Sequence, residues 1–163
     1  MNLKAIEGYE NLYSFDLNNN QVYSHISKKY IKPFLNNGYI VVRLYKNAKQ
    51  KKIYFHRLVY ELYHGTLPEN MCIDHIDNNK LNNNITNLRL ATYSQNGMNR
   101  KAQKNNLSTG YKCITITKHN NYQVRIYKNK KVVYNKTFKT LEEAINNRDL
   151  NLKIIHGDFY NFG

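Results

Sequence analysis

Apolar and polar residues alternate along the first third of the chain, and this alternation is typical of half-buried β-strands. It is clearest over residues 39–45, which follow an Asn37-Gly38 turn. Residues 53–56 resume it after a polar turn, so the two segments are predicted to form a hairpin. Two shorter apolar stretches predict further strands, at 22–24 and 30–33. Residues 1–56 are therefore expected to form an antiparallel β segment.

The period changes after residue 56, where apolar positions recur three or four residues apart, as on one face of a helix. These positions are Leu58, Val59, Leu62 and Tyr63. Gly65 is the expected end of this helix, because glycine readily adopts the conformation that follows a helix. His56 stands at the join of strand and helix, and we interpret it as a structural residue rather than a catalytic one.

The centre of the chain has the pattern of a strand, a long polar loop, a second strand and a helix. A short apolar stretch at 71–73 leads directly into Asp74 and His75. A loop rich in asparagine follows and closes at Asn87. Asparagine favours turns, so this segment is predicted to be irregular.

Residues 88–92 alternate again and predict the return strand. Ser94 is the predicted N-cap of a helix, which places Asn96 in its first turn. This helix is expected to continue through Lys101 before a basic, polar linker begins at Lys104. Because a strand–loop–strand–helix unit folds back on itself, four polar residues are expected to meet at one spot. They are Asp74, His75, Asn87 and Asn96.

The last third of the chain predicts a three-stranded sheet and one helix. The strands are expected at 111–117, 122–127 and 132–138. Thr140-Leu-Glu-Glu143 matches the capping box that opens a helix, and Gly157 is the expected end of that helix. One helix covers one face of such a sheet and leaves the other face open. By alternation Gln123, Arg125 and Tyr127 share a face of their strand.

Charge indicates the kind of partner. The 163 residues include 25 Lys plus Arg against 11 Asp plus Glu, a formal net charge of +14. This excess favours a polyanion, and nucleic acid ahead of a membrane, because no long apolar run or basic amphipathic anchor occurs. The first residues contain no apolar signal core, so we expect an intracellular, soluble protein. No coiled coil or other sign of an obligate protein partner is evident. The two cysteines, Cys72 and Cys113, are too few for a cysteine-rich zinc site.

The central polar residues suit one particular chemistry. Asp74 offers a carboxylate oxygen and Asn96 an amide oxygen, which are donors that Mg²⁺ or Mn²⁺ prefers. His75 can take a proton from water near neutral pH. Asn87 is expected to fix either this imidazole or its loop, and the helix start at Ser94 favours an anion. One metal ion, one base and one anion-binding helix end describe the hydrolysis of a phosphodiester.

This loop has two other interpretations. Asparagine-rich loops are common turn material, so the segment could be structural. Clustered Asp and Asn also occur in EF-hand calcium loops, but this loop lacks their central glycine and closing glutamate. The ordered spacing favours the nuclease interpretation.

The motif also has a family resemblance. It reads Asp74-His-Ile-Asp-x-Asn-Lys-x-Asn-Asn-x-x-x-Asn-Leu-Arg89 and continues in Ser94-Gln-Asn96. It resembles the HNH endonucleases, particularly the phage and intron-encoded homing endonucleases, with asparagine as the third letter. The opening Gly8-Tyr-Glu-x-x-Tyr13 resembles the nuclease-associated modular motif found before the HNH core in many of them.

The resemblance implies a ββα-metal core with assigned roles. Asp74 and Asn96 would bind the metal ion, and His75 would be the general base. Asn87 would orient that histidine. Two further residues are expected to contact phosphate, Lys80 and Arg89.

The last segment resembles the ethylene-response-factor type of DNA-binding domain. The match lies in Gly110-Tyr-Lys-x-Ile114, Tyr122-x-Val-Arg-Ile126, Thr137-Phe-Lys-Thr-x-Glu-Glu-Ala144 and Asn161-Phe162. In that family the sheet lies in the major groove, so Gln123, Arg125 and Tyr127 are candidate base readers. Arg125 could contact a guanine through two hydrogen bonds. Lys112 and Lys136 are expected to contact phosphate.

The predicted fold is α+β in three parts. They are an N-terminal antiparallel β motif at 1–56, an HNH core with its preceding helix and basic tail at 57–104, and a three-stranded sheet packed on one helix at 105–163.

The predicted function is site-specific hydrolysis of double-stranded DNA with one divalent ion, as by a homing endonuclease. A single centre per chain predicts nicking. The alternatives are a non-enzymatic DNA-binding regulator with a decayed nuclease core and an RNA-directed enzyme or binder. Heavy use of Asn, Lys, Ile and Tyr fits the AT-rich genes of a phage or large virus.

Overall fold

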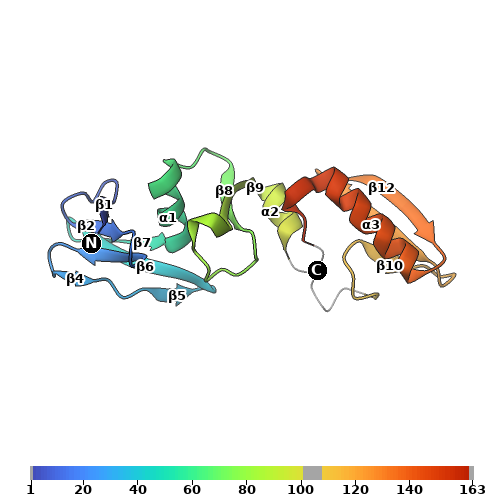
Figure 1. The fold of residues 1–163 in the computed structure, drawn as a ribbon, viewed down its shortest axis with the longest axis horizontal. Helices are drawn as coiled ribbons and strands as arrows, with labels where there is room; N and C mark the ends of the chain where they lie inside the picture. The colour runs from blue at the N-terminus through green and yellow to red at the C-terminus, as the bar shows by residue number, and fades with distance from the viewer. Residues whose placement is uncertain (1, 101–107, 162–163) are drawn as a thin grey trace. The chain divides into compact units, whose positions relative to one another are not determined.

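A computed structural model describes residues 2–100 and 108–161, and it confirms the predicted α+β class. Within these residues the strands form one four-stranded, two three-stranded and one two-stranded sheet, accompanied by three α-helices (Figure 1). The chain divides into two compact units. One comprises Met1–Glu69 and Asn79–Arg89, and the other Asn70–Asn78 and Leu90–Gly163. The predicted basic linker from Lys104, and with it the predicted boundary at 104/105, begins outside the described residues.

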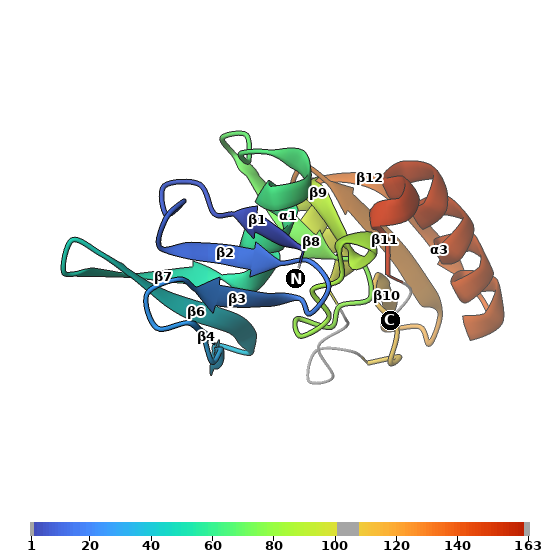
Figure 2. The same ribbon diagram turned by 60° about the vertical axis from the view of Figure 1, so that its left-hand side comes forward.

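The first unit opens with a four-stranded sheet in which each strand pairs with the next along the chain (Figure 2). Its strands are β1 (Leu3–Ala5), β2 (Tyr13–Asp16), β3 (Gln21–Ser24) and β4 (Lys29–Tyr30). Asp16 is fully buried and accepts hydrogen bonds from Tyr30 Oη (2.6 Å), Asn19 Nδ2 (2.8 Å) and Asn18 N (3.0 Å). The Tyr30 hydrogen bond is the main cause that lowers the pKa of Asp16 to about 2.

A second sheet and a helix complete this unit. They are β5 (Phe34–Asn36), β6 (Tyr39–Lys46), β7 (Lys49–Tyr54) and α1 (Phe55–His64). The predicted hairpin is confirmed, with β6 and β7 paired from Val41↔Tyr54 to Lys46↔Lys49. The strand predicted at 30–33 is wrong: only Tyr30 lies in a strand, β4, and residues 31–33 connect β4 to β5. Pro33 has no N–H for a sheet hydrogen bond, which accounts for the interruption.

Helix α1 begins one residue earlier than predicted, so β7 ends at Tyr54 and not at residue 56. Phe55 is buried together with Leu58, Val59 and Leu62 on the inner face of this helix. The Phe55 ring lies 5.5 Å from the Phe15 ring of β2. Burial of these side chains stabilises the helix against the sheets.

The predicted strand–loop–strand–helix elements are present. Strand β8 (Met71–His75) pairs with β9 (Leu88–Thr92), which the short 3-10 helix η1 (Ile85–Asn87) precedes and helix α2 (Tyr93–Asn99) follows. Of these elements, η1 and the first two residues of β9 belong to the first unit, and the rest belong to the second. The predicted cap at Ser94 is wrong. The N-cap is Thr92, whose Oγ1 accepts from Gln95 N (3.2 Å) while Gln95 Oε1 accepts from Thr92 N (2.8 Å). This reciprocal pair is a capping box. The helix ends at Asn99, and the predicted extension to Lys101 falls outside the described residues.

The C-terminal sheet and helix form as predicted. The elements are β10 (Ile114–Ile116), β11 (Tyr122–Lys128), β12 (Lys131–Phe138), α3 (Leu141–His156) and the 3-10 helix η3 (Gly157–Phe159). Helix α3 lies along one face of the sheet, over a core of Ile114, Val124, Ile126, Ala144 and Leu152 (Figure 1). Its capping box joins Thr140 and Glu143, as the sequence predicts. Strand β10 is shorter than predicted, because Cys113 has a φ of +64° that interrupts the extended backbone.

No helix in the described part of the chain is both long and apolar enough to cross a bilayer.

Candidate active site

Strand β8 carries the predicted metal ligand Asp74 and helix α2 carries the other, Asn96, and both influence the Cys72 thiol. Cys72 and Asp74 lie two residues apart and therefore point to the same face of β8. The side chain of Asn96 makes a hydrogen bond to Cys72, and the carboxylate of Asp74 is close enough to influence the same thiol. Burial raises the pKa of Cys72, the hydrogen bond from Asn96 opposes that rise, and the charge of Asp74 adds to it. Asp74 from β8 and Asn96 from α2 thus both act on the Cys72 thiol.

Asp74 is buried and held by a residue that the sequence did not single out. Asn99, which is only 2% exposed, donates from Nδ2 to Asp74 Oδ1 (2.9 Å) and Oδ2 (3.0 Å). The same nitrogen lies 2.8 Å from the carbonyl oxygen of His75. The available signal was a second asparagine three residues after Asn96, which shares the inner face of α2 with it.

His75 is the last residue of β8 and is also buried. Successive residues of a strand point to opposite faces, so its imidazole leaves the strand on the side opposite the Asp74 carboxylate. Its carbonyl oxygen accepts from Asn99 Nδ2 and from Asn78 N (2.9 Å). These hydrogen bonds fix the backbone from which the predicted base extends.

Asn87 lies in the first unit, at the end of η1. Its Nδ2 donates to the carbonyl oxygen of Asn82 (2.8 Å), so the side chain secures the asparagine-rich loop. Asn84 caps η1 by accepting from Thr86 N (3.2 Å). Fixing the loop is one of the two roles expected for Asn87, and orientation of His75 stays a prediction.

The two cations predicted to contact phosphate near this loop also lie in the first unit. The ammonium of Lys80 is 4.3 Å from the centre of the Tyr39 ring and 3.5 Å from the carbonyl oxygen of Asn37. Arg89 is half-buried in β9. The centre of the His56 ring lies 5.2 Å from that of the Tyr39 ring, with the two rings tilted by 44°, in keeping with a structural role.

The predicted metal donors are oxygen atoms. Across residues 2–100 and 108–161, no group of three or more His, Cys, Asp or Glu side chains could hold a metal ion. Asp74 and Asn96 would instead offer one carboxylate and one amide oxygen. Mg²⁺ commonly keeps several water ligands and binds proteins through one or two carboxylates, so a small oxygen set suffices.

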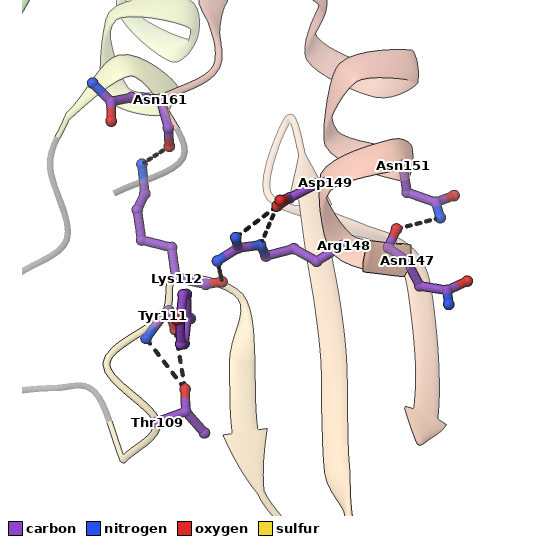
Figure 3. Close-up of polar contacts among 8 residues, drawn as sticks. All are labelled: Thr109, Tyr111, Lys112, Asn147, Arg148, Asp149, Asn151 and Asn161. Carbon is purple, nitrogen blue, oxygen red and sulfur yellow. Dashed lines mark hydrogen bonds and ion pairs between the residues drawn. The ribbon is translucent and has the colours of Figure 1, made fainter. Parts of the chain in front are cut away.

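Lys112 has a different environment from the one predicted. Its Nζ donates to the carbonyl oxygens of Arg100 (2.5 Å), Met98 (3.0 Å) and Asn161 (3.3 Å), and Figure 3 shows the last of these bonds. The ammonium also lies 5.4 Å from the Tyr160 ring. Burial lowers the pKa of Lys112. These contacts join the C-terminal end of α2 to the C-terminal sheet, and they favour a structural role over a phosphate contact.

Arg148 of α3, like Lys112, makes its contacts within the fold. It is 2% exposed, and its guanidinium pairs with Asp149 through Nε (2.7 Å) and Nη2 (2.6 Å) (Figure 3). Its Cζ lies 5.1 Å from the centre of the Tyr111 ring. Arg148 Nη1 also donates to the carbonyl oxygen of Lys112 (3.5 Å), 36 positions away in the chain, and a local sequence pattern does not reveal such a distant contact.

The candidate base readers occupy the face of the C-terminal sheet that α3 leaves uncovered. Arg125 Nη2 donates to Gln123 Oε1 (3.1 Å), and Gln123 Nε2 donates to Asn135 Oδ1 (3.0 Å). Tyr127 is 44% exposed on the same strand. Lys136 is exposed, but it pairs with Val124 and so lies on the α3 side of the sheet. Lys136 therefore does not share a face with Arg125.

The central part of the chain is similar to known proteins. Residues 53–98 match the HNH endonuclease family. The chain is 36% identical over 109 residues to the uncharacterized HNH endonuclease L560 of Acanthamoeba polyphaga mimivirus, covering 66% of this chain and 56% of that protein. It is 38% identical over 104 residues to the DNA endonuclease I-HmuI of Bacillus phage SP01, covering 63% and 59%. The matches thus span little more than half the length of these relatives.

The fold also matches a solved structure. That structure, of DNA binding and cleavage by the HNH homing endonuclease I-HmuI, is 27% identical with a TM-score of 0.57. The match covers 97% of this chain and 91% of the other. Together with the arrangement of β8 and α2, these findings show that residues 53–98 are similar to the HNH endonuclease family.

Proposed function

We propose that this protein is a site-specific DNA endonuclease of the homing kind, which hydrolyses phosphodiester bonds in double-stranded DNA with the help of one divalent ion. The observation that carries the proposal is the meeting of Asp74 and Asn96 at Cys72, inside the segment that matches the HNH family. His75, next in the chain after Asp74, supplies the base. Two relatives with endonuclease names and a matching fold support the same activity.

The chemical step uses His75 as a general base. Its imidazole accepts a proton from a water molecule, and the water oxygen forms a bond with the phosphorus as the bond to the 3′ oxygen breaks. The hydrogen bonds from Asn78 and Asn99 to the His75 carbonyl hold the end of β8 during this step. Asn87 steadies the loop that joins the two strands.

Asp74 and Asn96 would hold Mg²⁺ or Mn²⁺. When bound, such an ion supplies positive charge that stabilises the phosphate and the departing oxygen. One such centre cuts one strand in each event, so we propose that the enzyme nicks DNA.

A basic and aromatic face of the first unit supports a DNA substrate. Arg43 and Lys52 are paired across β6 and β7 and are both exposed. The Arg43 guanidinium lies 3.9 Å from the centre of the Phe34 ring. The Tyr54 hydroxyl of β7 accepts a hydrogen bond from Asn36 Nδ2 of β5, on the far side of β6 (3.2 Å). Cations held in place by rings and amides suit contacts with phosphate and with base edges. The formal charge of +14 agrees with such a partner.

A second DNA contact is proposed for the uncovered face of the C-terminal sheet. The hydrogen-bonded row of Arg125, Gln123 and Asn135 presents donors and acceptors in a fixed order. Such a row can read base edges in a major groove, and Arg125 would take guanine. This part of the proposal concerns site selection and not cleavage.

The test is a cleavage assay on supercoiled plasmid that carries candidate sites, run with Mg²⁺, with Mn²⁺ and with EDTA. We expect an open-circular product with either ion and none with EDTA. Cleavage that persists in EDTA, or that requires Zn²⁺, would contradict the assignment of Asp74 and Asn96. Protein that binds DNA under all conditions without cutting would favour the non-enzymatic alternative.

A further inference from the structure

We infer that Asn99 is a positioning residue that fixes the Asp74 carboxylate for metal binding. The inference rests on the proposed function, since it assigns a role within the same site. Asn99 lies at the last residue of α2, and its buried side chain reaches Asp74 across the strand–helix join. Twenty-five residues separate the two in the chain.

The orientation of the Asn99 amide follows from the chemistry of its neighbours. An ionised carboxylate and a backbone carbonyl only accept hydrogen bonds, so the amide nitrogen must face Asp74 and the His75 carbonyl. The amide oxygen then faces Asn78, whose Nδ2 lies 3.0 Å away and donates to it. Both ends of the Asn99 amide are thus engaged, and the side chain has one favourable orientation.

The contacts restrain Asp74 in two ways. Nearly equal distances of 2.9 Å and 3.0 Å to the two carboxylate oxygens centre the donor between them, which fixes the rotation of the carboxylate plane. The additional bond to the His75 carbonyl ties the same helix to the backbone beside the predicted base. Asn96 precedes Asn99 by one turn, so the helix carries one predicted ligand and positions the other.

Residues that orient a metal ligand commonly contribute about 10–100-fold to metal affinity or activity. Asn99→Ala should therefore weaken Mn²⁺ binding by about that factor. Binding is measured by electron paramagnetic resonance of free Mn²⁺ at a temperature where circular dichroism shows the variant to be folded. A folded Asn99→Ala protein that binds Mn²⁺ as tightly as the wild type would overturn the inference.

Asn78→Gly provides a second variant in case Asn99→Ala does not fold. Asn78 has a φ of +60°, which glycine adopts without strain, so this change removes the amide that orients Asn99 and little else. We expect a smaller weakening of Mn²⁺ binding in the same direction, and unchanged binding would contradict the inference.

Asn151→Ala is the matched control. Asn151 is also a helical asparagine whose Nδ2 donates to a carbonyl oxygen, that of Asn147 (2.7 Å), but it lies on α3 (Figure 3). Its replacement should leave Mn²⁺ binding unchanged, and an equal loss in this control would overturn the specific role of Asn99. Failure of the wild-type protein to bind Mn²⁺ or cut DNA would refute the proposed function itself. Wild-type binding with no effect of either site variant would refute only the positioning role.

Discussion

Asp16 and Asp74 are both buried aspartates, but the first unit uses one carboxylate for its fold, whereas in the proposed function the second unit offers the other for chemistry. All the hydrogen bonds to Asp16 come from residues within fourteen positions of it, on the turn after β2 and on β4. Asp74 is instead held by Asn99, from a helix beyond the long loop and the return strand. The local partners of Asp16 stabilise a turn, whereas Asn99, which is distant in the sequence, orients the Asp74 carboxylate.

The cations also divide into those engaged within the fold and those that are exposed. Lys112 and Arg148 are committed to backbone carbonyls, a carboxylate and aromatic rings, and so stabilise the fold. Arg125 and Lys136 are exposed on opposite faces of the C-terminal sheet. Net charge alone predicted a polyanion partner, but only the structure distinguishes cations that serve the fold from cations that a partner can reach.

The largest expected effect concerns His75. Replacement by alanine should lower the cleavage rate by about 10²–10⁴-fold, the usual contribution of a general base, while DNA binding stays close to that of the wild type. His64→Ala is the control, because His64 is an exposed histidine at the end of α1. Single-turnover cleavage rates and filter binding measure the two properties. A His75→Ala protein that cuts at the wild-type rate would remove the base from the proposed mechanism.

Asp16 should affect stability with a defined dependence on pH. Its pKa in the folded protein, about 2, lies below the ordinary value of 3.8. The stabilisation from its hydrogen bonds is therefore complete above the unfolded pKa and is lost as the pH falls from about 4 to about 2. Asp16→Asn should lower the thermal unfolding midpoint by several degrees at pH 7, and the difference from the wild type should shrink towards pH 2. A difference that grows as the pH falls would contradict this assignment.

Arg125 should affect the choice of site and not the rate of cutting. Arg125→Ala is expected to cost about 1–3 kcal/mol of binding free energy, concentrated at one base pair. A panel of single-base variants of the target measures this loss. An equal loss on every member of the panel would indicate that Arg125 contacts phosphate and not a base.

The smallest expected effects concern Lys112 and Lys136, which test whether buried and exposed cations have different roles. Lys112→Ala should lower the unfolding midpoint and leave the salt dependence of DNA binding unchanged, because its ammonium is bound to three carbonyl oxygens. Lys136→Ala should do the reverse and reduce the slope of log affinity against log salt by about one if it contacts phosphate. If both variants changed the unfolding midpoint and the salt dependence equally, the exposure of a lysine would not determine whether it stabilises the fold or contacts DNA.

The elements that the sequence predicted well are those determined by neighbouring residues. The β6–β7 hairpin follows from alternation and a two-residue turn at Asn47 and Ala48, both with positive φ. The capping box of α3 follows from two residues three positions apart. The start of α2 was misplaced because Thr92 and Ser94 are both good caps, and the Gln95 side chain decides in favour of Thr92.

The features that the sequence analysis missed depend on contacts between distant parts of the chain. Asn99 has an ordinary helical position, and only the fold brings it to Asp74. Lys112 resembles any basic residue until α2 and Asn161 surround its ammonium. Pattern analysis identifies which side chains could perform chemistry, but burial and partners decide which of them are committed to the fold.

The most direct measurement compares Asp74→Asn with Asp16→Asn in the same Mg²⁺-dependent plasmid cleavage assay, with the folded fraction of each protein measured alongside. Each change removes one buried carboxylate charge and keeps the shape of the side chain. We predict that Asp74→Asn stays folded and loses cleavage, while Asp16→Asn is less stable but cuts at close to the wild-type rate per folded molecule. Cleavage by folded Asp74→Asn at the wild-type rate would contradict the account that this carboxylate serves the active site.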